Sequence, residues 1–352
     1  MNQKDLLFFK SLLAAPSPSG FEKPASKLWR EYVAPFCEEV NSDYHGNSIA
    51  VKNMKSPYRL LFAGHIDELG FIVNYINDKG FVYFRPIGGH DRSMISGRSV
   101  HILSDKGIVK GVTGKKAIHM MTPEERKKVP EFEDIWIDIG VNSKEEAEKR
   151  ISVGDPVIYD VEFETINEQI AASRAFDDKA GAFAVALALK YLQKEKIVPA
   201  LFVAATVQEE IGLRGAHTSA YGVNPQVGIA VDVTHATDHP GIDNRKEGEI
   251  KLGGGPVILR GANANSKVVE LLINAAKKKK IPFQLEAAGG GTGTDANAIQ
   301  LTRGGVAAGL VSIPLRYMHT PREVIHLDDI KNTAKLLAEF ALSFNHPDEF
   351  LL

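Results

Sequence analysis

Two kinds of hydrophobic pattern recur along the chain, and together they predict an α/β fold. Apolar residues at helical spacing occupy 5–14, 23–34, 180–192 and 331–344. Short, mainly apolar runs occupy 58–63, 169–172, 200–207, 227–231 and 306–313. Runs of this length and composition are typical of strands buried on both faces of a mostly parallel sheet. We therefore expect a doubly wound α/β domain with a mixed sheet.

The region 70–165 has a different pattern, in which short segments alternate apolar and polar residues between turns. These segments are 71–75, 81–84, 99–103, 107–111, 135–139 and 155–159. Two polar pieces, 122–128 and 143–149, have a helical composition. The pattern predicts a small β barrel or sandwich inserted into the α/β domain, which would then comprise 1–69 and 166–352. We expect the insertion to serve assembly or access, because none of its strands ends in an acidic or histidine pair.

Ionisable side chains follow the apolar runs of the α/β domain at the points where the runs end. Four runs end in His65, Asp177, Glu210 and Asp232, and a fifth leads into His319. Ligands of open α/β sheets bind at the carboxyl ends of the strands, so we expect these side chains to meet. Histidines and carboxylates without cysteine suit two hard or borderline divalent ions about 3.5–4 Å apart. Spacing alone does not choose between Asp177 and its neighbour Asp178.

In each of two pairs of nearby side chains, the two members can have different roles in such a site. Glu209 and Glu210 are adjacent on an extended segment, so their side chains point to opposite sides. One of them could bind an ion while the other handles a proton. Asp67 lies on the same side of its segment as His65, where its carboxylate can orient the imidazole and raise its basicity as a ligand.

Composition narrows the class of protein further. The chain has 352 residues, 44% of them hydrophobic and 24% charged, as expected of an ordered globular protein. A net charge of -2 with both signs interspersed gives no reason to expect binding to nucleic acid or to an anionic membrane. The N-terminus lacks a signal-peptide pattern, and no apolar run approaches the ~18 residues of a membrane span. The single cysteine, Cys37, excludes an internal disulfide and fits a reducing compartment, so we expect a cytoplasmic protein.

A glycine-rich segment at 289–296 matches the pattern G-x-G-x-x-A, but it is a weak dinucleotide-binding signal. The apolar run before it covers only 283–285, and no acidic residue ends a strand about 20 residues later. We expect instead a loop that forms part of the wall of the site, with a helix at 295–301 behind it.

Six motifs in this chain resemble those of the glutamyl-aminopeptidase and cellulase-M family of metallopeptidases, which includes the tetrahedral (TET) aminopeptidases. The motifs are Gly64–Glu68, Arg174–Lys179, Gln208–Gly212, Asp232–Thr234, Gly289–Asp295 and Arg316–Pro321. They occur in the family's order and span nearly the whole chain. The resemblance implies a dinuclear, metal-dependent aminopeptidase that removes N-terminal residues from short peptides, with an inserted β domain that mediates dimerisation and with dodecamers as a common assembly.

The resemblance also implies a role for each matching residue. The ligands of two divalent ions, with zinc or cobalt expected, would be His65, Asp177, Glu210, Asp232 and His319. Asp177 would bridge the two ions. Glu209 would be the general base, and Asp67 would orient His65. His90 stands where the family pattern has an aromatic residue.

Three other functions remain open at this level. A metal-dependent deacylase or carboxypeptidase could use the same catalytic core. A glycoside hydrolase needs two carboxyls that face each other about 5–9.5 Å apart, which the adjacent Glu209 and Glu210 do not provide, and it would leave the histidines unused. A non-catalytic binding protein on this fold would not need the full set of ligands and the base.

Overall fold

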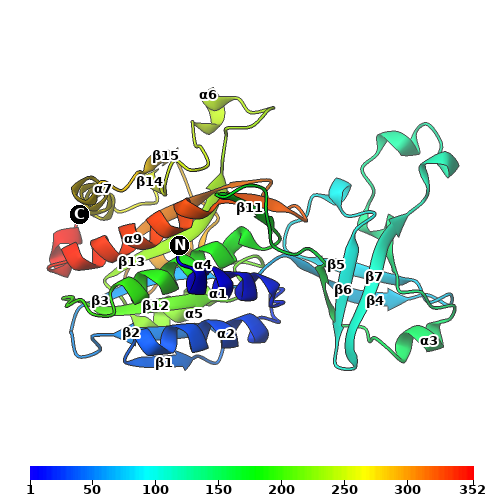
Figure 1. Ribbon diagram of the computed structural model, residues 1–352, viewed down its shortest axis with the longest axis horizontal. Helices are drawn as coiled ribbons and strands as arrows, with labels where there is room; N and C mark the ends of the chain where they lie inside the picture. The colour runs from blue at the N-terminus through cyan, green and yellow to red at the C-terminus, as the bar shows by residue number, and fades with distance from the viewer.

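The computed structural model describes residues 1–352 as two lobes lying side by side, an α/β domain and a closed barrel (Figure 1). The α/β domain contains an 11-stranded mixed sheet with the order β1-β2-β12-β3-β13-β16-β17-β11-β10, and β14 joins β15 to β16. The strands are β1 (Glu39–Ser42), β2 (Ser48–Lys52), β3 (Arg59–His65), β10 (Glu164–Thr165), β11 (Ile170–Ser173), β12 (Ala200–Thr206), β13 (Val227–His235), β14 (Val257–Gly261), β15 (Gln284–Ala288), β16 (Ala307–Arg316) and β17 (Glu323–His326).

The centre of this sheet is parallel. Strand β3 pairs in parallel with β12 on one side and with β13 on the other, and β13 pairs in parallel with β16. The outer pairs β1–β2, β2–β12, β16–β17 and β11–β17 are antiparallel. The four central strands therefore end at one common edge, which is where the ionisable residues were expected to meet.

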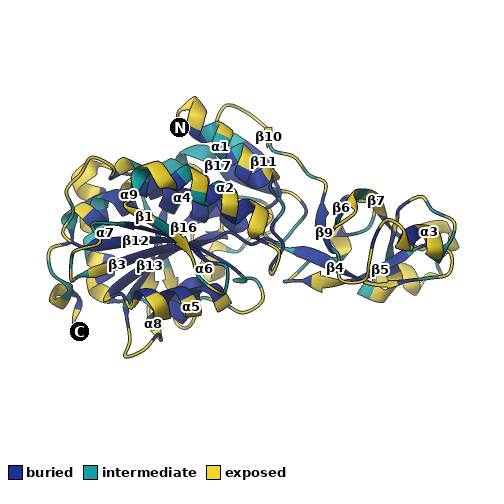
Figure 2. Ribbon diagram, turned by 90° about the horizontal axis from the view of Figure 1, so that it is seen from below, coloured by how far each residue is buried: buried dark blue, intermediate teal, exposed yellow.

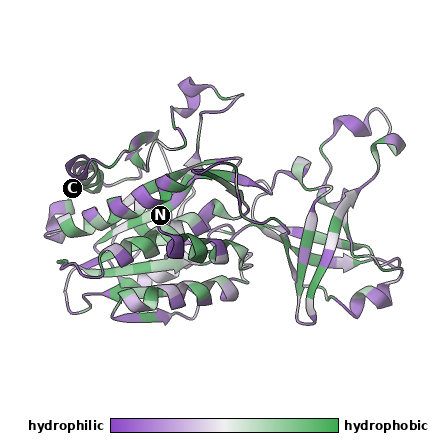
Figure 3. Cartoon of the chain, viewed as in Figure 1, coloured by the Kyte–Doolittle hydropathy of each residue, from purple (hydrophilic) through white to green (hydrophobic).

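Helices cover both faces of the sheet (Figure 2). Helices α1 (Gln3–Ala14), α2 (Lys23–Val33), α4 (Phe176–Tyr191) and α9 (Leu327–Ser343) lie over one face, and α5 (Arg214–Val223) and α8 (Asp295–Gln300) lie over the other. Helix α7 (Ser266–Lys279) packs against α9, and α6 (Asn244–Glu247) lies in the long connection after β13. A core of 51 buried apolar residues lies mainly between the sheet and helices α1, α2, α4 and α9. A second core of 12 residues lies under α5 and α8. Figure 3 shows these apolar residues along the sheet and the inner helix faces.

The barrel is built from six antiparallel strands in the order β4-β5-β8-β7-β6-β9. They are β4 (Gly70–Ile76), β5 (Val82–Ile87), β6 (Ser99–Ser104), β7 (Gly107–Lys115), β8 (Ile135–Asp138) and β9 (Pro156–Tyr159), with α3 (Lys144–Glu148) between β8 and β9. The barrel has a core of its own, made of 15 buried apolar residues. Alternating strands that each give one face to this core explain the period-two pattern of the sequence.

The expected fold class is confirmed: a mixed α/β sheet domain carries a small closed barrel. Some local predictions differ from the structure. The piece 122–128 forms only a short 3-10 turn, Glu125–Lys127, and β10 at Glu164–Thr165 pairs with β11 in the large sheet instead of joining the barrel. No helix is long and apolar enough to cross a membrane.

Candidate metal centre

A cavity of about 580 Å³ opens at the carboxyl ends of the parallel strands. Its lining includes the five expected metal ligands and the expected base, namely His65, Asp177, Glu209, Glu210, Asp232 and His319. His65 ends β3, the two glutamates follow β12, Asp232 lies in β13, and His319 follows β16. The strand order β12-β3-β13-β16 brings these four segments together, and α4 supplies Asp177 from above the sheet edge.

The carboxylate of Asp177 lies between the two histidines. His65 Nε2 is 3.2 Å from Asp177 Oδ1, and His319 Nε2 is 3.4 Å from Asp177 Oδ2. Burial raises the pKa of Asp177, but the hydrogen bonds from His319 and His65 outweigh it and hold that pKa below its usual range. Each oxygen of this one carboxylate therefore faces a different histidine.

The neighbouring Asp178 has a different environment. Its Oδ1 accepts a hydrogen bond from the Gly181 N–H at 2.9 Å, and its Oδ2 accepts one from the His65 N–H at 3.1 Å. It is fully buried and does not line the cavity, whereas Asp177 does. Asp178 also lies within ligand distance of His65 and Asp232, but both of its oxygens are already hydrogen-bonded to the backbone.

The remaining carboxylates surround the same point. His65 Nε2 is 3.9 Å from Glu209 Oε2 and 4.0 Å from Asp232 Oδ1, while His319 Nε2 is 3.7 Å from Glu210 Oε2. Burial, reinforced by the charges of the neighbouring carboxylates, raises the pKa of Glu209 to about 9 and that of Asp232 to about 7. The same two causes raise the pKa of Glu210 well above its usual range.

These side chains fit divalent cations. Ligand atoms of His65, Asp177 and Glu210 all lie within 4.8 Å of one another. Glu210 Oε1 is buried and has no hydrogen-bond partner, which is costly for a carboxylate oxygen unless a cation binds it. Imidazole and carboxylate donors without thiolate suit zinc and other borderline or hard ions.

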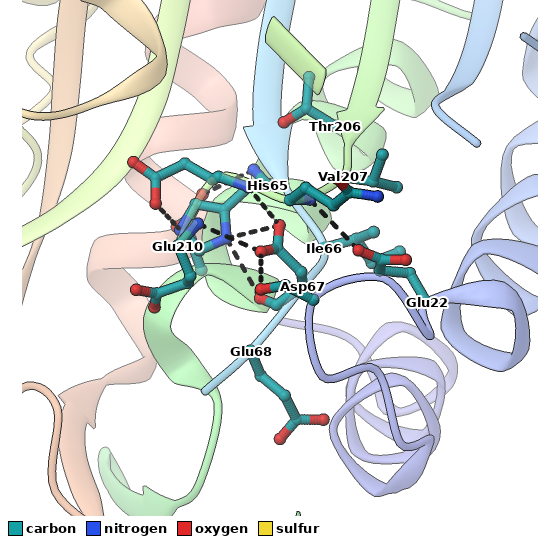
Figure 4. A network of polar contacts seen from close by, with 12 residues as sticks. Glu22, His65, Ile66, Asp67, Glu68, Thr206, Val207 and Glu210 are labelled. Carbon is teal, nitrogen blue, oxygen red and sulfur yellow. Dashed lines mark hydrogen bonds and ion pairs between the residues drawn. The ribbon is translucent and has the colours of Figure 1, made fainter. Parts of the chain in front are cut away.

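Asp67 lies behind the site, where it contacts both His65 and the segment that follows β12 (Figure 4). The His65 Nδ1 atom is 3.1 Å from the Asp67 backbone carbonyl and 3.4 Å from Asp67 Oδ1. The Asp67 carboxylate also accepts hydrogen bonds from the backbone N–H groups of Glu209 (3.1 Å) and Glu210 (3.3 Å). One fully buried carboxylate thus connects a candidate ligand with the segment that carries the candidate base.

Two further side chains that the sequence did not single out support the site. Ser19 Oγ donates a 2.7 Å hydrogen bond to Asp67 Oδ2. Glu323, at the start of β17, is 3% exposed, and its carboxylate accepts the Asp177 N–H at 3.1 Å. Ser19 lies in the turn that ends the first helical segment, and Glu323 lies four residues after His319. Only Glu323 has a signal in the sequence, its nearness to the motif Arg316–Pro321, because both roles depend on contacts between distant segments.

The insertion approaches the site at one loop, although none of its residues lines the cavity. Gly88 and Gly89 follow β5 and lie against the candidate ligands. A Cβ atom at Gly88 would lie 3.3 Å from the Glu210 Cβ, and one at Gly89 would lie 3.4 Å from His319 Nδ1. Gly88 has φ +77°, a conformation that favours glycine. This loop lies close to Glu210 and His319 without offering a side chain to the cavity.

His90, which replaces an aromatic residue of the family pattern, points toward the barrel. Its ring stacks on Phe71 with centroids 4.3 Å apart, and its Nε2 lies 2.8 Å from the Gly70 carbonyl oxygen. Burial lowers the pKa of His90 to about 4, so the neutral ring is the stable form. The imidazole therefore packs as an aromatic ring would.

The glycine-rich segment lies where the sequence predicted it. Thr292, Gly293 and Thr294 line the cavity, and α8 begins directly after them. Behind this wall, Thr206 Oγ1 donates a 2.6 Å hydrogen bond to Asp295 Oδ2. The segment is therefore part of the site and not a nucleotide-binding turn at the start of a parallel βαβ unit.

Comparisons with known proteins agree with this geometry. The sequence profile described as M42 glutamyl aminopeptidase matches residues 46–336. A lysyl aminopeptidase from Pyrococcus furiosus is 33% identical over 338 residues, which cover 94% of this chain and 95% of that protein.

Two solved structures are similar over nearly their whole length. A TET aminopeptidase from a marine sediment archaeon of the Thaumarchaeota is 36% identical with a TM-score of 0.93, and the match covers 97% of each chain. The TET1 peptidase of Pyrococcus horikoshii, which can assemble into a tetrahedron or a large octahedral shell, is 30% identical with a TM-score of 0.85, over 97% of this chain and 100% of that one. The chain therefore belongs to the M42 glutamyl aminopeptidase family and is a hydrolase that acts on peptides.

Proposed function

We propose that the protein is a dinuclear metal-dependent aminopeptidase. The observation that carries this proposal is the carboxylate of Asp177, whose two oxygens face His65 and His319 at 3.2 and 3.4 Å. A carboxylate between two imidazoles is the arrangement that a bridging ligand needs. Asp177 would be shared by both ions, with His65, Asp232, Glu210 and His319 as the other ligands. Zinc or cobalt would suit this donor set.

Two bound divalent ions would supply Lewis acidity and lower the pKa of a shared water. Glu209 is the group that would take the proton from this water, since its carboxylate lines the cavity and is not needed as a ligand. Its pKa of about 9 reflects burial among other carboxylates, so Glu209 ionises readily only when positive charge is present nearby. Once protonated, it can pass the proton to the amine that leaves.

The charge of the cavity favours an aminopeptidase over a carboxypeptidase. Its lining contains several carboxylates but no lysine or arginine. A substrate's terminal ammonium group would be attracted to this surface, whereas a terminal carboxylate would find no positively charged side chain to bind it. The proposed substrates are therefore short peptides with a free amino terminus.

Metal analysis combined with aminoacyl-arylamide hydrolysis tests the proposal. The purified protein, stripped with a chelator and reloaded with zinc or cobalt, should bind two ions per chain and release the arylamine only when metal is present. A glycoside hydrolase would cleave aryl glycosides with or without chelator, and a deacylase would cleave N-acyl amino acids in preference to free aminoacyl-arylamides. Either result would contradict the assignment.

We also propose that the barrel mediates assembly into dimers and larger particles, including dodecamers. Several large apolar side chains are exposed on it, among them Ile108 (64%), Met120 (73%) and Val153 (65%). Apolar side chains that gather into an exposed patch mark interaction surfaces. The assembly of the Pyrococcus horikoshii relative supports the same proposal. We also propose a cytoplasmic location, because a single cysteine fits a reducing compartment.

A further inference from the structure

Glu286 is an acidic side chain in the cavity that the proposed reaction does not use. It lies on β15 opposite Leu259 of β14, and both residues line the cavity. Thr234 Oγ1 lies 3.0 and 3.1 Å from the two carboxylate oxygens of Glu286 and donates its proton to them. This one hydroxyl is the only hydrogen-bond donor that the chain directs at the carboxylate.

No cationic side chain of the chain neutralises Glu286. It takes part in no ion pair, and its neighbour on the paired strand, Arg260, lines a different cavity. His235 lines the same cavity and favours the charged form of Glu286, but it is exposed and lies beyond ion-pair distance. Burial raises the pKa of the Glu286 carboxyl, as expected for a carboxylate that lacks a positive partner.

The position of Glu286 relative to the candidate ligands suits a substrate side chain. Thr234 is two residues beyond Asp232 on β13, so the two side chains lie on the same face of the strand. Glu286 is therefore the next acidic group along the cavity from the ion site. The lining also includes the apolar residues Leu259 and Leu310, which can contact a methylene chain. The cavity volume of about 580 Å³ is within the range that binds small ligands.

We propose that Glu286 binds the side chain of the substrate's first residue and gives the enzyme a preference for lysine or arginine at that position. This inference rests on the aminopeptidase function proposed above. A lysine or arginine side chain has an apolar stem and a cationic head, which match the apolar wall and the carboxylate. An N-terminal glutamate or aspartate would meet a like charge and be disfavoured.

Kinetics of the metal-loaded protein with lysyl-, arginyl-, leucyl- and glutamyl-arylamides test the proposal. The wild-type protein should have a higher kcat/KM for the lysyl and arginyl substrates than for the glutamyl one. In Glu286→Gln, which keeps the shape of the side chain, the lysyl-to-leucyl ratio of kcat/KM should fall about tenfold or more, as expected for the loss of one charge-assisted hydrogen bond. In Glu286→Lys the preference should move toward the glutamyl substrate.

The leucyl substrate separates this inference from the function on which it rests. If Glu286→Gln and the wild-type protein hydrolyse leucyl-arylamide equally well but show the same lysyl-to-leucyl ratio, Glu286 does not select the substrate. If the metal-loaded wild-type protein hydrolyses none of the four arylamides, the proposed function itself is wrong. Glu270→Gln, which removes an exposed carboxylate from α7, should leave every ratio unchanged.

Product inhibition gives a second measurement without turnover of a lysyl substrate. Free L-lysine should inhibit leucyl-arylamide hydrolysis more strongly than L-norleucine, which has an apolar side chain of similar length and no cationic head. Glu286→Gln should remove most of this difference. Equal inhibition by the two amino acids in the wild-type protein would overturn the proposal.

Discussion

The α/β domain and the barrel differ in how many ionisable side chains they bury. The α/β domain buries many ionisable side chains, including Asp67, Glu68, Asp178, Lys179 and Glu323, each at most 3% exposed. Between Gly70 and Tyr159, by contrast, Thr113 is the only buried polar residue. Large apolar side chains are exposed on both lobes, for example Ile108 and Met120 on the barrel and Tyr221 and Leu301 on the α/β domain, so the difference lies in the buried charge.

Buried charge and exposed apolar surface are both unfavourable for an isolated, inert domain, so each indicates a function. Burying a carboxylate costs several kcal/mol unless it is paired or binds a cation, and exposing apolar groups favours association with a partner. Most of the buried charged side chains of the α/β domain lie around the candidate metal centre. We propose that another copy of the chain covers the exposed apolar side chains of the barrel. The predictions below test whether chemistry and assembly are separated in this way.

The largest effect is expected for the ligand that both ions would share. Asp177→Ala should lose both ions and all measurable activity, because the two oxygens of this carboxylate face His65 and His319. His65→Ala and His319→Ala should each weaken mainly one ion. Metal content per chain, measured by elemental analysis after dialysis, distinguishes these cases.

Asp178→Ala is the matched comparison for this prediction. Its carboxylate bonds to the backbone N–H groups of His65 and Gly181, so its loss should lower stability while leaving part of the metal bound. If Asp178→Ala empties the site and Asp177→Ala does not, the shared ligand has been assigned to the wrong neighbour.

The next largest effect should come from the candidate base. Glu209→Gln preserves shape but cannot accept a proton, so kcat should fall by at least ~10², the usual lower limit for general-base catalysis. Metal content should stay at the wild-type value, because Glu209 is not proposed as a ligand. A metal-replete variant that keeps nearly normal kcat would rule out this role.

The sequence predicted the parts of the site that follow from local pattern. Buried parallel strands such as β3 and β12 are recognisable by their apolar runs, and their carboxyl ends must meet at one edge. This is why His65 and Glu210 could be named before the structure was known. The six barrel strands could be predicted for a similar reason, because each alternates apolar and polar residues.

The remaining features depend on contacts that no local pattern encodes. Spacing could not separate Asp177 from Asp178, since the choice rests on which carboxylate bonds to Gly181 in the folded chain. The role of Glu323 requires β17 to lie beside the start of α4. The approach of Gly88 to Glu210 requires the barrel to be placed against the α/β domain, and a glycine carries no chemical signal of such a contact.

This contact of Gly88 changes how the role of the barrel should be tested. Deleting the whole insertion would remove this support of Glu210 and His319 as well as the exposed apolar side chains. Charged substitutions on that surface are cleaner: Ile118→Asp combined with Met120→Asp should yield smaller particles, because both side chains are exposed and apolar. Metal content and kcat/KM on short arylamides should change little.

Light scattering measures the size of these particles. Lys149→Asp, a charge change at an exposed position on the same lobe, is the control and should leave the size unaltered. An unchanged large particle in the double variant would exclude this part of the barrel from the interface.

The smallest effect is expected for the Ser19 hydroxyl, which contacts Asp67 behind the site. Ser19 Oγ donates to Asp67 Oδ2 at 2.7 Å, and Asp67 in turn holds the backbone of Glu209 and Glu210. Ser19→Ala should lower kcat about fivefold, the value of roughly 1 kcal/mol for one hydrogen bond, without loss of metal.

Ser26 provides the control for this substitution, because its hydroxyl is also buried but has no hydrogen-bond partner. Ser26→Ala should therefore leave kcat unchanged. Melting temperature and metal content measured on both variants separate a positioning effect from a general loss of stability. If Ser19→Ala lowers the melting temperature and leaves kcat of the folded protein intact, Ser19 stabilises the fold without positioning the base. If kcat falls while metal content and melting temperature match those of Ser26→Ala, the buried polar groups of the α/β domain extend the site beyond the residues that line the cavity.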